Sequence, residues 1–222
     1  MGDFLKNRQV EFRLFIVLVA VCVALSLTTD TFLTLGNLTS LLNNNSVNLI
    51  WAVGLLVVLI AGGIDISFAV ASSVVQFIAA KLLSGMGGGN WIFGFLICGS
   101  LGVCLGLVNA ALIHGFRIIS IIVTIATFNA FFGLLMFLSG GRSIYALPDW
   151  WVDRVAIFRH AVEGGPASEL TLPVAVMVVC VGSTWFLIRR MNLGRQLYAF
   201  GDNPEGARRA GVNLAVMQGL AF

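Results

Sequence analysis

The chain has 222 residues, of which 59% are apolar and 10% are charged, whereas ordinary soluble domains have about 45–50% and about 25%. Together with a mean hydropathy of +0.98, this composition excludes a soluble globular domain. It predicts an all-α membrane protein, a polytopic bundle of membrane-spanning helices. The net charge of +3 is small, and the sequence has no basic patch interleaved with aromatic residues that would indicate nucleic acid as a partner.

The first membrane span is predicted at residues 14–29, which are uncharged and apolar. We expect it to be an uncleaved helix, because the small-residue pattern of a signal-peptide cleavage site is missing. Lys6, Arg8 and Arg13 precede it, and this basic flank predicts a cytoplasmic N-terminus. Residues 31–46 are uncharged but rich in asparagine, which is costly in lipid. We therefore expect a short helix or loop at the outer interface there.

A helix break is predicted between the second span, at residues 47–64, and the third, at residues 66–80. As one straight helix, residues 47–80 would be about 51 Å long, which is too long for a hydrocarbon core of about 30 Å. Gly62, Gly63 and Asp65 mark the natural break. Asp65 fits the N-cap of a helix that begins at Ile66. Ion coupling, or a gate or contact in a translocation path, are the other interpretations of this acid.

The fourth span is predicted at residues 91–113 and the fifth at residues 118–139, after a flexible outer turn at residues 84–90. A short inner turn at residues 114–117 joins the two spans. In the fourth span, Gly102, Gly106 and Ala110 form a ridge of small residues that lets helices approach closely. We favour packing within the chain over a dedicated dimer face for this ridge.

The longest segment of mixed charge is residues 140–169, whose tyrosine and tryptophans predict an interfacial loop. We interpret His160 in this loop as a solvated residue without a functional role. The sixth span follows at residues 170–188 and ends at Arg189 and Arg190. Six crossings from a cytoplasmic N-terminus return the chain to the cytoplasm, and these two arginines agree with that count.

The sequence contains no residues arranged for catalysis or cofactor binding. The four cysteines all lie in apolar runs without metal-ligand spacing, so we expect neither disulfides nor a metal site. There is no phosphate-binding loop, no serine elbow and no pair of carboxylates within one span. We therefore expect no enzymatic activity and no cofactor, and no binding and hydrolysis of ATP by this chain through a phosphate-binding loop.

Residues 194–212 predict a short helix with a clear signal at each end. Asn203 is a good N-cap, Pro204 suits the first helical position, and Glu205 favours the positive end of the helix dipole. Two arginines fall in the last turn, and Gly211 can take the left-handed conformation that follows a helix. The predicted helix, residues 204–210, is shorter than the about 12–15 residues that an isolated helix needs. We interpret it as a docking element.

The last residues, 213–222, turn apolar again. They are too few to cross a bilayer, so we expect the start of a seventh span and a chain truncated on its C-terminal side. Residues 1–222 are predicted to form a single transmembrane domain that contains a cytoplasmic loop at residues 189–212.

Two motifs carry a family resemblance. GGIDIS, residues 62–67, resembles a motif of sugar-type ABC importer permeases, the family of ribose, xylose, arabinose and autoinducer-2 membrane subunits. GRQLYAFGDNPEGARRAG, residues 194–211, is similar to the cytoplasmic coupling loop of the same family, which docks on the ATP-binding subunit. An asparagine-rich segment, GLVNAALI and IIVTIATF occur in the same order as in that family.

The resemblance implies a permease in the bacterial plasma (inner) membrane that translocates a sugar or sugar-like solute. Its implied partners are an ATP-binding subunit, a second permease copy, and a periplasmic or lipoprotein solute-binding protein. Residues implied in ATPase coupling are Gly194, Arg195, Gly201, Asn203, Pro204, Glu205 and Gly211. Residues implied in the translocation path or its hinge are Gly62, Gly63, Asp65 and Ser67. The alternatives are an ion-coupled secondary transporter that uses Asp65, and a non-transporting membrane scaffold.

Overall fold

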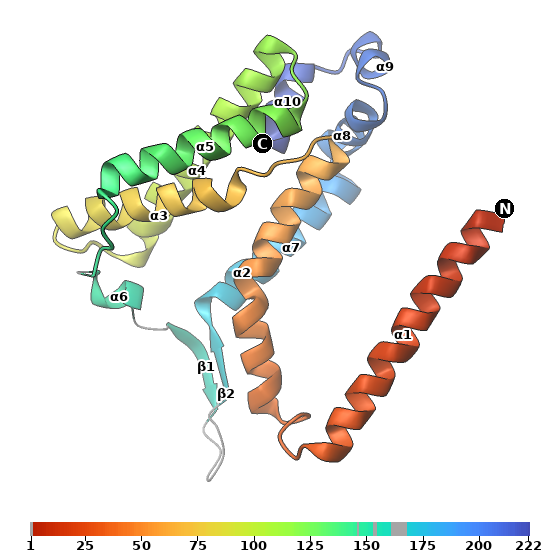
Figure 1. Ribbon diagram of the computed structural model, residues 1–222, viewed down its shortest axis with the longest axis vertical. Helices are drawn as coiled ribbons and strands as arrows, with labels where there is room; N and C mark the ends of the chain where they lie inside the picture. Colours follow the sequence, from red (N-terminus) through yellow and green to blue (C-terminus); the bar gives the residue numbers. More distant parts are fainter. Residues whose placement is uncertain (1, 146, 153–154, 161–167) are drawn as a thin grey trace. The chain divides into compact units, whose positions relative to one another are not determined.

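The computed structural model describes residues 2–145, 147–152, 155–160 and 168–222 (Figure 1). Asp153, Arg154 and Glu163 of the predicted interfacial loop lie outside the described residues, and so do the side chains of Lys6, Arg8 and His160.

Among the described residues, 6 helices are long and apolar enough to cross a membrane. They are α1 (Gly2–Thr28), α2 (Leu35–Ile60), α3 (Phe68–Gly85), α4 (Trp91–Phe116), α5 (Ser120–Ser139) and α7 (Leu172–Arg190). The shorter elements are α6 (Asp149–Val152), β1 (Ala156–His160), β2 (Ser168–Thr171), α8 (Asn192–Asp202), α9 (Pro204–Arg209) and α10 (Leu214–Ala221). These elements confirm the predicted α-helical, polytopic membrane protein.

Contacts group the chain into two compact units, Met1–Ser46 with Ala156–Val174, and Val47–Val155 with Ala175–Phe222. In the first unit, β1 and β2 form an antiparallel hairpin in which Arg159 pairs with Glu169 at 2.7 Å. This hairpin lies in the segment that we expected to be an interfacial loop. The expectation of a single domain stays a prediction.

The asparagine-rich segment is helical and continuous with the second span, which corrects the expected start of that span at residue 47, whereas its place at the outer interface stays a prediction. One helix, α2, begins at Leu35 and runs to Ile60. Asn43 of this helix has partners in β2, because its side chain accepts from the backbone and hydroxyl of Thr171 at 3.1 and 2.8 Å. The same side chain donates to the carbonyl of Glu169 at 2.7 Å. Its hydrogen bonds to the hairpin strand β2 offset the cost of a polar side chain in this position.

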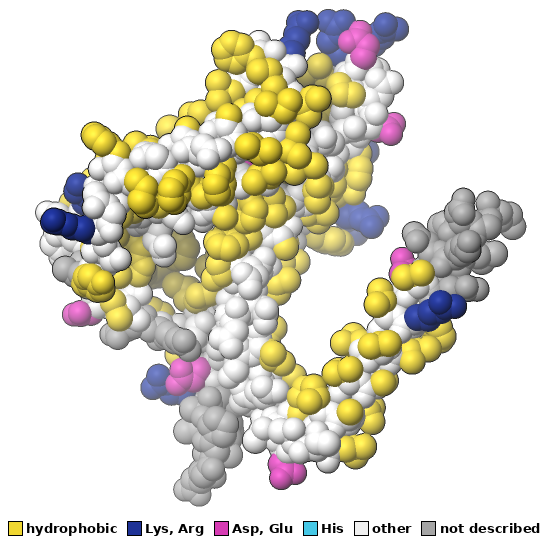
Figure 2. All heavy atoms as spheres, viewed as in Figure 1, with side chains coloured by type: hydrophobic (Ala, Val, Ile, Leu, Met, Phe, Trp, Pro, Cys, Tyr) yellow, Lys and Arg dark blue, Asp and Glu magenta, His cyan; other side chains and the backbone are white. Residues whose placement is uncertain are grey.

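In the second unit, α3 packs against α4 and α5, and α10 packs against α4 and α8 (Figure 1). The small-residue ridge on α4 serves this packing: a methyl group on Gly106 would collide with the backbone of Phe222, and Ala110 is buried. This confirms packing within the chain at these two positions. The large apolar side chains of the long helices are mostly exposed (Figure 2). An apolar coat of this kind is suited to lipid rather than water.

Several helix boundaries differ from those predicted. The third long helix, α3, begins at Phe68 instead of Ile66 and extends past Lys81 to Gly85. The fourth, α4, continues to Phe116, so the predicted inner turn shortens to the region of Arg117, which has a left-handed backbone. Asn90 caps α4 by accepting from the backbone of Phe93. Hydrophobicity alone does not locate such ends, because helices continue beyond the apolar run until a cap or a turn stops them.

Candidate functional site

The short helix α9 has the ends that the sequence predicts. Its N-cap Asn203 accepts from the backbone N–H of Gly206 at 2.9 Å, and Pro204 holds the first position. Glu205 pairs with Arg208 at 2.9 Å and with Arg209 at 3.5 Å, both on the exposed face. A hydrogen bond from Arg208, together with its charge, holds the pKa of Glu205 below its ordinary value.

Backbone geometry after α9 also agrees with the prediction. The helix ends at Arg209, with Ala210 as its C-cap, and Gly211 follows with φ +86°. This left-handed residue lets the amide of Val212 bond back to the carbonyl of Ala207. The charged side chains of α9 are exposed and stand together at one end of the helix pair α8–α9 (Figure 2).

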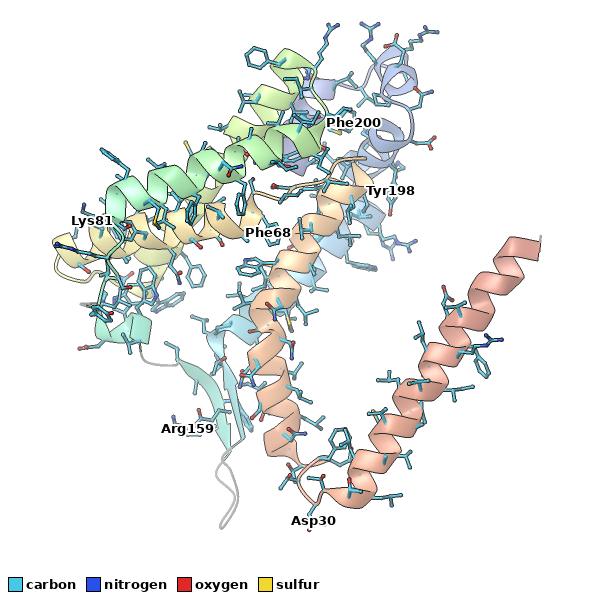
Figure 3. All side chains as sticks on the ribbon, in the orientation of Figure 1. Asp30, Phe68, Lys81, Arg159, Tyr198 and Phe200 are labelled. Atoms are coloured by element: carbon cyan, nitrogen blue, oxygen red, sulfur yellow. The ribbon has the colours of Figure 1, made fainter. Side chains whose placement is uncertain are left out.

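The sequence analysis missed α8, the amphipathic helix that precedes α9. Leu197 and Phe200 are buried in a cluster with Met217 and Ala221 of α10, whereas Tyr198 is 52% exposed (Figure 3). The helix had a detectable signal, because Leu193, Leu197 and Phe200 recur at helical spacing among polar residues. The predicted coupling loop is therefore a pair of short helices.

Two predicted coupling residues lie in the first turn of α8. Gly194 is buried where α8 turns away from α7, and a methyl group there would collide with the carbonyl oxygen of Ile188. Arg195 is exposed and lies 3.3 Å from the side chain of Asn192. The first residue allows a tight turn, and the second offers a cation to the exterior.

A helix break separates α2 from α3, as the length argument predicts. Gly62 has φ +75°, a conformation that favours glycine. The backbone N–H of Ile64 donates to Ser120 Oγ at 2.9 Å, and its carbonyl accepts from Thr124 Oγ1 at 3.2 Å. Both partners belong to α5, so this helix fixes the path of the break.

Asp65 lies within the break, not at the N-cap of the next helix. Its Oδ1 accepts from the backbone N–H and the hydroxyl of Ser67, both at 2.7 Å. Ser67 occupies the N-cap position of α3 without a side-chain bond to that helix. The predicted capping role of Asp65 is therefore wrong as stated. Its short side chain bonds to the turn two residues on, which competes with helix capping.

The break and the coupling segment touch each other through two glycines. A methyl group on Gly62 would lie 3.0 Å from the carbonyl oxygen of Gly201, and one on Gly201 would collide with the carbonyl oxygen of Ile60. The backbones of α8 and of the end of α2 are therefore in direct contact. The structure thus brings together two predicted sets of residues that are far apart in the sequence.

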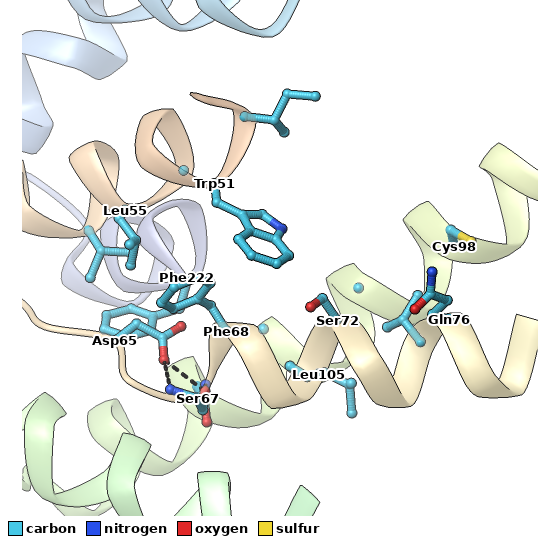
Figure 4. Close-up of a pocket in the computed structure, with 18 of the residues that line it drawn as sticks. Trp51, Leu55, Asp65, Ser67, Phe68, Ser72, Gln76, Cys98, Leu105 and Phe222 are labelled. Atoms are coloured by element: carbon cyan, nitrogen blue, oxygen red, sulfur yellow. Dashed lines mark hydrogen bonds between the residues drawn. The ribbon is translucent and has the colours of Figure 1, made fainter. Parts of the chain in front are cut away.

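A cavity of about 770 Å³ lies beside the break (Figure 4). Its walls come from α2, α3, α4 and nearby segments, and its polar lining includes Asp65, Ser67, Ser72, Gln76 and Asn109. Trp51 and Phe68 form an edge-to-face pair on one wall, with ring centroids 5.7 Å apart. Among the described residues there is no group of three or more side chains suited to hold a metal ion.

A buried hydrogen-bonded row connects α4 to the break. Asn109 Nδ2 donates to Ser67 Oγ at 2.8 Å, and Ser67 Oγ donates to Asp65 Oδ1 at 2.7 Å. Asn109 and Ser67 are buried. The sequence analysis assigned no role to Asn109, although an asparagine within an otherwise apolar span is itself a signal, because such a residue needs a partner.

The family model described as the permease component of branched-chain amino acid transport systems matches residues 37–222. The chain belongs to this family. The D-allose transport system permease protein AlsC of Escherichia coli is 29% identical over 201 residues, which are 90% of this chain and 59% of that protein. The ribose import permease protein RbsC of Haemophilus influenzae is 25% identical over 225 residues, 100% of this chain and 66% of that protein.

Another relative in this permease family is the autoinducer 2 import system permease protein LsrC of Photorhabdus luminescens. It is 27% identical over 224 residues, which cover 100% of this chain and 64% of that protein. The chain thus spans 59% to 66% of the length of these relatives. No solved structure matches it significantly.

Proposed function

We propose that this chain is the membrane-spanning permease subunit of a binding-protein-dependent ABC importer for a sugar or sugar-like solute. The observation that carries the proposal is the backbone contact between Gly62 and Gly201, which joins an exposed charged helix pair to the helix break beside a cavity. The names of the relatives support it, since they are permeases of D-allose, ribose and autoinducer 2 import systems.

The proposed partners are those that the resemblance to sugar importer permeases implies. An ATP-binding subunit would dock on α9, where Glu205, Arg208 and Arg209 are exposed. A second permease copy would complete the membrane assembly, and a periplasmic or lipoprotein binding protein would deliver the solute. The protein would lie in the bacterial plasma (inner) membrane. Its N-terminus would lie in the cytoplasm, because Lys6, Arg8 and Arg13 precede the first span and two further arginines end α7.

In this mechanism, α8 and α9 move together when the ATP-binding subunits close. The buried side chains of Leu197 and Phe200 pack α8 against α10. The helix α8 therefore moves as part of a packed unit and not as a flexible loop. Gly201 then displaces Gly62 through a contact of backbone on backbone, which cannot yield by a side-chain rotation. The break carries Asp65 and Ser67, so this displacement reaches the cavity wall directly.

The proposal is tested by reconstitution with the ATP-binding subunit and the binding protein in lipid vesicles. We expect uptake of radiolabelled D-ribose or D-allose that requires ATP on the side of the membrane that carries the ATP-binding subunit. Asp65→Asn separates the proposal from the ion-coupled alternative, because the neutral isostere abolishes coupling to a proton or sodium gradient. ATP-independent uptake that a gradient drives and Asp65→Asn removes would refute the proposal. Absence of any flux with all subunits present would favour a scaffold.

A further inference from the structure

The hydrogen-bonded row at the cavity has a fixed direction. Ser67 has one hydroxyl proton, and it goes to Asp65 Oδ1 at 2.7 Å. Ser67 Oγ can therefore only accept a hydrogen bond from Asn109. The donor must be the Nδ2 group of Asn109, which lies 2.8 Å away. This argument assigns the orientation of the Asn109 amide, which the positions of its heavy atoms alone would leave open.

The carbonyl oxygen of the Asn109 side chain is consequently an acceptor. Asn109 lines the cavity and is 2% exposed, and its Oδ1 is the one buried side-chain atom without a hydrogen-bond partner among the described residues. A buried acceptor without a donor is unfavourable, so a native structure that contains one calls for an explanation. Because this oxygen is buried, a donor on a molecule in the cavity would reach it after a rotation of the Asn109 side chain.

Ser72 adds a second acceptor to the same wall. Its hydroxyl donates to the carbonyl oxygen of Ala69 at 2.8 Å, so toward the cavity it also can only accept. Asp65 adds a carboxylate and is the one charged side chain among the described residues that line the cavity. The polar side of the cavity therefore presents three acceptors, on Asp65, Ser72 and Asn109.

The other wall of the cavity is apolar and is formed by the rings of Trp51 and Phe68 (Figure 4). The indole N–H of Trp51 and the amide of Gln76 provide donors. A volume of about 770 Å³ is in the range of small-molecule sites. An apolar wall facing a row of acceptors suits a molecule with C–H faces and several hydroxyl groups.

We propose that this cavity is a solute-binding site in the membrane subunit, and that Asn109 and Ser72 determine its preference for neutral solutes with several hydroxyl donors. The inference rests on the proposed function. A carboxylate or phosphate on the solute brings acceptors only, and it would meet the acceptor row and the charge of Asp65. A branched-chain amino acid carries such a carboxylate, and its one ammonium group can pair only with Asp65, so we expect it to bind more weakly than a neutral solute with several hydroxyl groups.

The experiment measures binding by the full chain in phosphatidylethanolamine–phosphatidylglycerol nanodiscs without ATP, with D-allose, D-ribose and L-leucine as probes. Ser72→Ala removes one acceptor and nothing else from the cavity. Its matched control is Ser73→Ala, because Ser73 also donates to the carbonyl of Ala69, at 3.1 Å, but does not line the cavity. We expect Ser72→Ala to weaken binding of the sugars about three- to tenfold, and Ser73→Ala to leave it unchanged.

Asn109→Leu should weaken binding more strongly, and Asn129→Leu is its control, since Asn129 is exposed on α5 and bonds only within its own helix. Thermal melting of each variant shows whether it folds. The proposal is overturned if the sugars do not bind, if L-leucine binds as tightly, or if Ser72→Ala and Ser73→Ala behave alike. ATP-driven uptake that survives both cavity variants would refute the site alone and leave the proposed function standing.

Discussion

Gly201→Ala tests the contact between the coupling segment and the helix break most directly. The added methyl group would collide with the carbonyl oxygen of Ile60 and would lie 3.0 Å from the carbonyl carbons of Ile60 and Ala61. All three atoms belong to the backbone, so no side-chain rotation relieves the clash. The end of α2 and the helix α8 must therefore separate.

The size of the effect follows from two opposing contributions. Alanine within a helix is more favourable than glycine by about 1 kcal/mol. Overpacking of a close contact costs about 1–3 kcal/mol. The net destabilisation is therefore about 0–2 kcal/mol, and the chain should still fold. The clash lies at the contact through which α8 is proposed to displace Gly62. We therefore expect ATP-driven uptake to fall at least tenfold, while the ATP-binding subunit still docks.

Gly182→Ala is the matched control. Gly182 lies within α7, and a methyl group there would have no neighbouring atom within 4 Å. It should leave uptake unchanged and stabilise the chain by up to about 1 kcal/mol. The measurements are co-purification with the ATP-binding subunit, ATPase rate, solute uptake and thermal melting. Uptake by Gly201→Ala at the rate of Gly182→Ala would refute the transmission through this contact.

Other predictions concern the ends of the same segment and the hairpin. Gly211→Val should weaken docking of the ATP-binding subunit in co-purification by about 1–3 kcal/mol, because φ is +86° there and valine is strained in that conformation. Gly211→Asn should be tolerated, since asparagine adopts this conformation more readily and no atom lies within 4 Å to add a clash. The lowered pKa of Glu205 means that its ion pairs stabilise α9 above about its ordinary value of 4.5 and are lost as pH falls through the lowered value. An NMR titration of the Glu205 carboxyl should show this, with the pKa moving up in Arg208→Ala. Asn43→Leu should speed hydrogen exchange of the β2 amides about tenfold or more, whereas Asn45→Leu, whose asparagine bonds to its own helix, should not.

Features that depend on neighbouring residues could be predicted from the sequence. All the signals for α9 lie within a few residues, from the N-cap Asn203 to Gly211, and each acts through local backbone geometry. The break at Gly62 followed from a length that no bilayer accommodates, and the described helices confirm it. Six apolar runs gave the six long helices for the same reason, because burial in lipid needs only composition and length.

Features that depend on distant partners could not be predicted. The polar start of α2 is helical, and Asn43 there bonds to a strand that lies far along the chain. Without knowledge of that partner, the cost of asparagine in lipid argues for a short helix or loop at the interface. The partner of Asn109 could not be predicted for the same reason, since Ser67 lies in the break before α3, far from Asn109 in the sequence. Helix ends were misplaced where a helix continues beyond its apolar run to a cap or a turn, as at the end of α4.

The contact between Gly62 and Gly201 explains why residues from two motifs belong to one site. Gly62 has a local justification, its positive φ, whereas Gly201 has a helical backbone in α8 that alanine would favour. A glycine in such a position can mark a close approach of two backbones, but it does not name the partner, so the sequence cannot reveal the pair. In the structure, any side chain at Gly201 would separate α8 from α2, and the break that carries Asp65 would lose its contact with α8. Close approach of the two backbones is what allows a movement outside the membrane to reach the acceptor row in the cavity, because packed backbone transmits a displacement that flexible side chains would absorb.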